Sequence, residues 1–141
     1  MMASLIATCG RTAAVLPILF AGWAGLTGTS AQAQSLHPMR AVVKSFSDTF
    51  AVRVFPGNPY RGRLPVEVRV YDQNFQPIKA RIAPARAIIG AESKRSVLVE
   101  VPFNGASQRK IRICAEAVPM KAGNQSIRTQ VCGKFLAKRL R

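Results

Sequence analysis

The stretch from Thr49 to Tyr71 reads TFAVRVFPGNPYRGRLPVEVRVY, and it alternates apolar and polar side chains on either side of a central turn. Arg53, Glu67 and Arg69 occupy the polar positions of the two alternating runs. Because successive side chains point to opposite faces of a β-strand, each run predicts a half-buried strand. The Pro, Gly and Asn residues of PGNPYRG (56–62) predict the turn between them. The predicted inward residues are Phe50, Val52, Val54, Val66, Val68 and Val70.

The same two-residue period recurs along the rest of the chain, separated by short segments rich in Gly, Asn, Asp and Pro. No long stretch has a helical stripe of apolar residues. About seven strands in about 100 residues favour an all-β fold, an immunoglobulin-like antiparallel β-sandwich, with a small barrel as the alternative. The further runs are SVLVEVPF (96–103), KIRIC (110–114) and QVCGKF (130–135), with weaker candidates in RAVVKSF (40–46) and PIKARI (77–82).

The first 33 residues have the features of an export signal rather than of the fold. Arg11 precedes the apolar run TAAVLPILFAGWAGL, and SAQA follows it with small residues at Ala31 and Ala33. This order predicts a signal peptide over 1–33, cleaved after Ala33, and an uncleaved membrane anchor is the alternative. We therefore expect a single domain over 34–141 in the periplasm, with no transmembrane span in the mature chain.

A family resemblance adds to this interpretation. The order FAVRVFPGNP, LPVEVRVYD, PARAIIGAES, SVLVEVPF and RKIRICAE resembles the N-terminal immunoglobulin-like domain of periplasmic pilus chaperones, the PapD-like group, over roughly residues 38–117. The resemblance implies a β-sandwich and an exported location. Those chaperones have two such domains, and they anchor a subunit with basic residues in the cleft between them. The mature chain has room for one domain, so the fold and the location carry over, the cleft residues do not, and edge-strand binding carries over as a hypothesis.

Two of the three cysteines remain after loss of the predicted signal peptide, namely Cys114 and Cys132. An even number of cysteines in an oxidising compartment is typical of a disulfide. Placing the two opposite each other in a hairpin also puts Ile111 opposite Phe135, with the apolar residues on one face and the cysteines on the other. The turn then falls at Gly123-Asn124. A redox pair and a zinc site are the alternatives, weakened by the absence of a C-x-x-C motif and of further ligands.

Catalytic chemistry has little support in the sequence. The six acidic residues sit singly, so no paired-carboxylate site is suggested. The single histidine, His37, falls in a lead that we expect to precede the folded strands. No Gly-rich phosphate loop joins a strand to a helix. We expect a protein that is not an enzyme and that has no cofactor and no metal.

Positive charge dominates the surface, with 21 Lys and Arg residues against 6 Asp and Glu. Such a surface attracts anionic partners, although solvated outward positions screened by salt are the simpler explanation. In the predicted hairpin Arg112 lies opposite Lys134, and like charges in this position destabilise a sheet. Our candidates for binding an anionic partner are Arg109, Lys110, Arg112, Lys134, Lys138, Arg139 and Arg141.

Two functions are compatible with these features. The first is an exported, non-enzymatic immunoglobulin-like module of the bacterial cell envelope, which binds another envelope protein or assists its assembly by edge-strand pairing. The alternative is a basic envelope protein that binds anionic lipid or polysaccharide through its cationic surface. Nucleic acid is disfavoured as a partner, because the protein is expected to be exported and no basic-aromatic platform is present.

Overall fold

A computed structural model describes residues 34–117, 120–122 and 125–140. The predicted signal peptide, residues 1–33, lies outside them. Within the described ranges, no helix has the length and apolar character to cross a membrane. The strands found there are β1 (Ser35–His37), β2 (Arg40–Ser45), β3 (Thr49–Gly57), β4 (Leu64–Asp72), β5 (Arg81–Ala83), β6 (Arg86–Ile89), β7 (Val97–Pro102), β8 (Gln108–Ala117), β9 (Met120–Ala122), β10 (Gln125–Ile127) and β11 (Gln130–Arg139).

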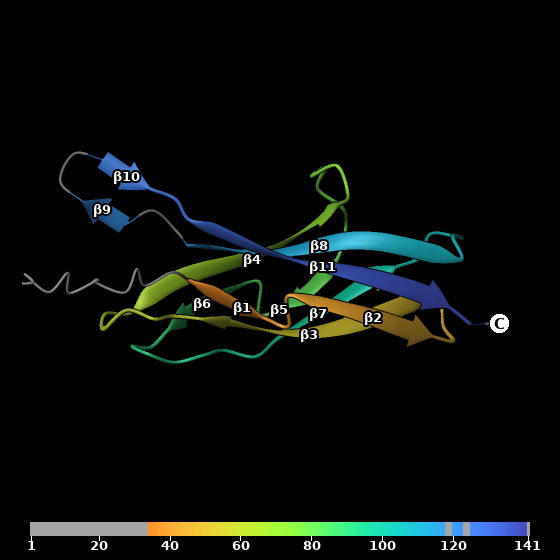
Figure 1. The fold of residues 1–141 in the computed structure, drawn as a ribbon, viewed down its shortest axis with the longest axis horizontal. Helices are drawn as coiled ribbons and strands as arrows, with labels where there is room; N and C mark the ends of the chain where they lie inside the picture. Colours follow the sequence, from red (N-terminus) through yellow and green to blue (C-terminus); the bar gives the residue numbers. More distant parts are fainter. Residues whose placement is uncertain (1–33, 118–119, 123–124, 141) are drawn as a thin grey trace, which may run out of the picture. The chain divides into compact units, whose positions relative to one another are not determined.

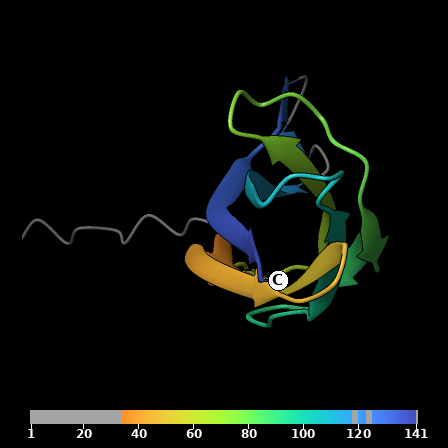
Figure 2. The ribbon, with the colours of Figure 1, turned by 90° about the vertical axis from the view of Figure 1, so that its right-hand side faces the viewer.

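Two sheets make up the fold, with strand orders β1-β3-β7-β5 and β2-β11-β8-β4-β6, and the short pair β9 and β10 continues the hairpin of β8 and β11 (Figure 1). Viewed along the strands, the sheets curve around a common interior (Figure 2). The all-β, immunoglobulin-like sandwich predicted from the sequence is confirmed. The strands are more numerous than the seven expected, because β1 precedes the first predicted strand, β6 forms where no strand was predicted, and the last hairpin gains β9 and β10.

The N-terminal strand changes sheets at Pro38. β1 pairs antiparallel with β3, whereas β2 pairs parallel with β11, the last strand of the chain. Proline has no amide hydrogen to continue a ladder, which suits it to the point where the chain leaves one sheet for the other. His37 pairs with Phe55 in β1, so the expectation that it lies in a lead before the folded strands is wrong.

The core is built from the inward residues of the alternating runs. Every inward residue predicted in the 49–71 stretch is buried, with exposed fractions of 0–5%. Phe50 packs its ring against that of Phe103, with 4.9 Å between the ring centroids. Outward neighbours such as Arg53 and Arg69 are exposed, so the period of two correctly divides core from surface. Burial of this apolar set is the main stabilising contribution to the sandwich.

One buried polar side chain ties together two loops that each pass from one sheet to the other. Asn58, only 2% exposed, lies in the β3–β4 connection. Its Nδ2 donates to the carbonyls of Gly62 (2.7 Å), Gly90 (2.8 Å) and Ile89 (3.2 Å). Its Oδ1 accepts from the amide of Tyr60 at 3.0 Å, so both polar atoms of the buried amide are satisfied.

The hairpin of β8 and β11 has the register predicted from the cysteines. Cys132 lies opposite Cys114, and Phe135 lies opposite Ile111. A disulfide joins the two cysteine sulfur atoms, with an S–S distance of 2.06 Å. The pairing continues as far as Ala122 and Gln125. The turn residues proposed between them, Gly123 and Asn124, lie outside the described residues.

Candidate functional site: the outer face of the stapled hairpin

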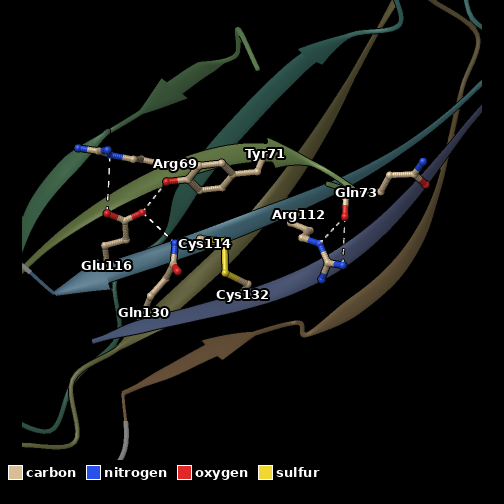
Figure 3. The surroundings of a disulfide bond; sticks show 8 residues. All are labelled: Arg69, Tyr71, Gln73, Arg112, Cys114, Glu116, Gln130 and Cys132. Carbon is tan, nitrogen blue, oxygen red and sulfur yellow. Dashed lines mark hydrogen bonds and ion pairs between the residues drawn. A yellow bond between two sulfur atoms is a disulfide. The ribbon is translucent and has the colours of Figure 1, made fainter. Parts of the chain in front are cut away.

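The outer face of the five-stranded sheet carries the disulfide, and the disulfide divides this face into two regions of different chemistry. Polar and acidic side chains gather toward the start of β11, around Glu116 and Gln130, and Arg112 lies on the other side of the disulfide (Figure 3). The β8–β11 register places further basic residues toward the end of β11. Cys114 is fully buried although it belongs to the outward row of β8. The disulfide therefore forms part of a packed surface rather than an exposed redox centre.

Glu116 is the centre of the polar region. Its Oε1 accepts from the hydroxyl of Tyr71 at 2.7 Å and from Nε2 of Gln130 at 3.0 Å. Its Oε2 lies 3.8 Å from Nε of Arg69. With an exposed fraction of 7%, this carboxylate depends on these partners to offset its desolvation.

The expectation that the acidic residues sit singly is wrong for Glu67 and Glu116. The β4–β8 register places these two residues directly opposite each other, a pairing between distant strands that local alternation cannot indicate. Arg69 contacts both, at 3.2 Å from Oε1 of Glu67 and 3.8 Å from Oε2 of Glu116. Arg86 adds a second cation at 3.4 Å from Glu67. The two carboxylates are thus bridged by arginine.

The pKa shifts in this region stabilise the charge states of an ion-pair network. The hydrogen bond from Arg69 lowers the pKa of Glu67, and the same hydrogen bond raises the pKa of Arg69. The hydrogen bond to Glu116 raises the pKa of Tyr71, since ionised phenol could no longer donate to the carboxylate. None of these shifts moves a group toward neutral pH, where a general acid or base would be useful.

Removing the Tyr71 hydroxyl tests the contribution of this network to stability. We expect Tyr71→Phe to lower the free energy of unfolding by about 1–2 kcal/mol, because Glu116 then keeps its burial and loses its shortest hydrogen bond. Urea denaturation followed by circular dichroism measures the change. Tyr60→Phe is the matched control, and its effect should be smaller because no hydrogen bond of the described residues uses the Tyr60 hydroxyl. Equal stabilities of the two variants would contradict the assignment.

Four of the seven predicted basic residues share the outer face, namely Lys110, Arg112, Lys134 and Lys138. Arg109 and Arg139 occupy the other parity of their strands, so they point away from this face. Arg109 donates to the carbonyl of Pro102, and Arg139 pairs with Asp48 at 2.5 Å. Arg141 lies outside the described residues. Lys134 lies directly opposite Arg112, as predicted.

Sequence reasoning missed two basic residues of this face, Arg40 and Lys44. The parallel pairing of β2 with β11 puts Arg40 beside Lys134 and Lys44 beside Lys138. The alternation in RAVVKSF contained the signal that Arg40, Val42 and Lys44 share a face. The missing information was the strand next to them, because β2 and β11 are about 90 residues apart in sequence, far beyond local pattern analysis.

Strand β2 forms one edge of this sheet. The carbonyls of Met39 and Ser45 accept from the amides of Lys134 and Leu140, at 2.8 Å each. Because backbone groups of a strand point alternately to either side, the even-numbered residues of β2 direct their backbone toward the side without a strand. Among the described residues no strand pairs with β2 on that side. Among the strands that end the two sheets, β2 is the longest, with six residues.

Metal ligands do not gather at this site. In the part of the chain that the structure describes, no three His, Cys, Asp or Glu residues are placed to hold a metal ion.

Among the described residues, two sheets with free edges and a first strand that changes sheets define an immunoglobulin-like β-sandwich, and this fold is similar to that of PapD-like chaperones. No protein-family model and no curated protein matches the sequence. Solved structures show the similarity. A chain of the Salmonella enterica SafA pilin–SafB chaperone complex has a TM-score of 0.62 and 15% identity, over 76% of this chain and 54% of that one. The E. coli chaperone DraB gives 0.61 and 16%, over 76% and 55%.

The similarity extends to proteins outside the pilus systems. The PapD-like domain 7 of human CEP192 has a TM-score of 0.56 and 9% identity, over 84% of this chain and 96% of that one. By contrast, this chain spans little more than half the length of the pilus-related chains above. At these identities the similarity establishes the fold, and the function has to be argued from the residues of this chain.

Proposed function

We propose that this protein is an exported, non-enzymatic binding module of the bacterial cell envelope that takes up an extended segment of another envelope protein at the free edge of β2. The observation that carries the proposal is the six-residue open edge of β2, held beside the disulfide-linked hairpin. An unpaired row of amides and carbonyls is a template for an added strand. The bound segment would become the next strand of the five-stranded sheet.

The similarity to pilus chaperones supports a binding function of this kind. SafB is named as a chaperone in complex with the pilin SafA, and a chain of that complex has a fold similar to this one. The predicted signal peptide and the disulfide support export to an oxidising compartment such as the periplasm. Because strand addition relies on the main chain, side chains of the partner would set specificity and its backbone would supply much of the affinity.

A single proline at the edge tests the proposal. Val42 directs its amide to the free side of β2, and proline is tolerated on an edge strand whose amide faces solvent. We expect Val42→Pro to fold and to weaken partner binding by about tenfold, through one lost hydrogen bond and the steric effect of the ring. Crosslinking in periplasmic extract identifies the partner, and titration with that purified partner measures the affinity.

A matched control is available on the opposite edge of the same sheet. The hydrogen bond from the Val68 amide to the Ala85 carbonyl fixes the β4–β6 pattern, so the amide of Ile88 points away from β4. Ile88→Pro should therefore leave the binding of the partner unchanged. Equal binding by the Val42 and Ile88 variants, or the absence of any specific crosslinked partner, would refute strand addition at β2.

A further inference from the structure

The cationic region of the outer face spans three neighbouring strands. The register places Lys134 of β11 between Arg40 of β2 and Arg112 of β8. These side chains alternate with buried residues in β8 and β11 and with half-buried residues in β2, so they point outward together. We name this surface the basic face, and it consists of Arg40, Lys44, Lys110, Arg112, Lys134 and Lys138.

No side-chain carboxylate neutralises the basic face. All six Asp and Glu residues of the chain lie among the described residues. The ion pairs there, within 4.0 Å, involve Arg69, Arg81, Arg86 and Arg139, and none involves a member of the basic face. Like charges on directly opposed strand positions repel each other, as at Arg112 and Lys134. An external anion would relieve this repulsion.

Apolar side chains project between the cations. Along β2 and just beyond it, the outward row runs Arg40, Val42, Lys44, Phe46, with Val42 60% exposed and Phe46 81% exposed. Leu136 lies beside Val42 on β11, and Lys110 of β8 continues the same row. Two apolar side chains therefore lie between Arg40 and Lys134 on one side and Lys44 and Lys138 on the other. A shallow groove of about 690 Å³ follows this surface, bordered by Arg40, Lys110, Arg112 and Lys134 and lined by Val42 and Leu136.

Arg112 is held in place without being neutralised. Its Nε and one terminal nitrogen each donate to the carbonyl of Gln73 at 3.3 Å (Figure 3). Its guanidinium also lies over the ring of Phe75, 4.3 Å from the ring centroid. A carbonyl and an aromatic ring orient the side chain while leaving its full positive charge. A cation ordered in this way loses less conformational entropy when it binds an anion.

We propose that the basic face docks on the surface of an anionic phospholipid bilayer. The cations lie at the level of the lipid phosphates, and Val42, Leu136 and Phe46 contact the interfacial region. An acidic strand added at β2 would run alongside that strand and face Arg40 and Lys44. It would not reach Lys110 and Arg112, which lie about 10 Å further across the sheet at the usual strand spacing. A bilayer surface meets all six cations and the apolar residues between them.

Charge reversal at the centre of the face tests the proposal with vesicles. We use the full chain and vesicles of phosphatidylglycerol and phosphatidylcholine in about equal parts, with pure phosphatidylcholine for comparison. Each Lys or Arg near such a surface contributes about fivefold in partitioning. We expect Lys110→Glu/Lys134→Glu to lower the partition coefficient at least about 25-fold, and added salt to weaken wild-type binding steeply.

A second variant of equal net charge provides the control. Arg53→Glu/Arg63→Glu makes the same charge change on exposed positions of β3 and of the loop before β4, away from the basic face. We expect its partitioning to fall less than about threefold, because charges beyond the screening length contribute little. Every variant retains residues 1–33, so that segment contributes equally to all of them. Thermal unfolding of each variant verifies that the fold is intact.

Three results would overturn the proposal. The first is equal loss of binding by the two double variants, which would make net charge rather than this face responsible. The second is wild-type binding that is no stronger on phosphatidylglycerol vesicles than on phosphatidylcholine. The third is unchanged vesicle binding by Lys110→Glu/Lys134→Glu together with lost binding to a crosslinked protein partner, which would assign the face to an acidic protein instead.

Discussion

Replacing Asn58 with alanine is expected to lower the free energy of unfolding by about 3 kcal/mol, the cost of leaving several buried groups without hydrogen bonds. Its Nδ2 is the donor for three carbonyls, those of Gly62, Ile89 and Gly90. Its Oδ1 is the acceptor for the Tyr60 amide. Alanine removes all of these contacts at a residue that is 2% exposed, where water cannot easily replace them.

Aspartate at the same position separates hydrogen bonding from size. Asn58→Asp keeps the shape of the side chain and the acceptor for Tyr60, but it places a carboxylate oxygen against the three carbonyls in place of their donor. Because a buried carboxylate oxygen that faces carbonyl oxygens instead of donors is costly, this variant should be at least as unstable as Asn58→Ala at neutral pH. Urea denaturation measures both variants, with Asn74→Ala in the exposed β4–β5 turn as the control. If Asn58→Asp left the free energy of unfolding unchanged, the role assigned to Nδ2 would be refuted.

Asn58 also illustrates how far sequence reasoning reaches in this protein. The PGNPYRG segment correctly predicted a turn between the strands that became β3 and β4, since Pro, Gly and Asn favour turn conformations locally. The same segment gives no indication that the side-chain amide of Asn58 reaches the carbonyl of Gly90, 32 residues further along the chain. A contact of this kind depends on how the two sheets pack, and local pattern analysis does not include that packing.

The binding surfaces show the same limit. Alternation and the cysteine positions predicted the β8–β11 register, and with it the pairing of Arg112 with Lys134, because a hairpin is a local structure. The contribution of β2 was missed, since its parallel pairing joins the two ends of the domain. Without β2, the four outward cations of the hairpin form a narrow strip. With Arg40 and Lys44 they form a face that borders an open edge.

The disulfide connects the edge with the face. β11 pairs with β2 on one side and with β8 on the other, so the register of both the edge and the basic face depends on the position of β11. The bond between Cys114 and Cys132 restricts sliding of β11 along β8, because a shift of one residue would turn Phe135 outward. The staple therefore has a function in both proposals without being a redox centre.

Loss of this staple is expected to lower the free energy of unfolding by about 3 kcal/mol, because the bond closes a loop of 18 residues of sequence separation and so restricts the unfolded chain. Urea denaturation of the oxidised and the dithiothreitol-reduced protein measures this difference in the free energy of unfolding directly. The double variant Cys114→Ala/Cys132→Ala should be at least as unstable as the reduced protein, and any excess is the lost packing of the buried Cys114 sulfur. Reductant should leave the double variant unchanged.

Thiol counting gives this prediction an independent check. When the oxidised protein is unfolded without reductant, a maleimide reagent should label neither Cys114 nor Cys132, so that Cys9 is the sole residue able to react wherever residues 1–33 remain attached. Labelling of both hairpin cysteines, together with equal stability of oxidised and reduced protein, would contradict the staple. A reducing environment would remove the disulfide and leave the folded protein with its core alone. The expected loss of about 3 kcal/mol in the free energy of unfolding is a large part of the 5–15 kcal/mol typical of a folded domain. The predicted export to an oxidising compartment would thus determine the stability of the protein as well as its location.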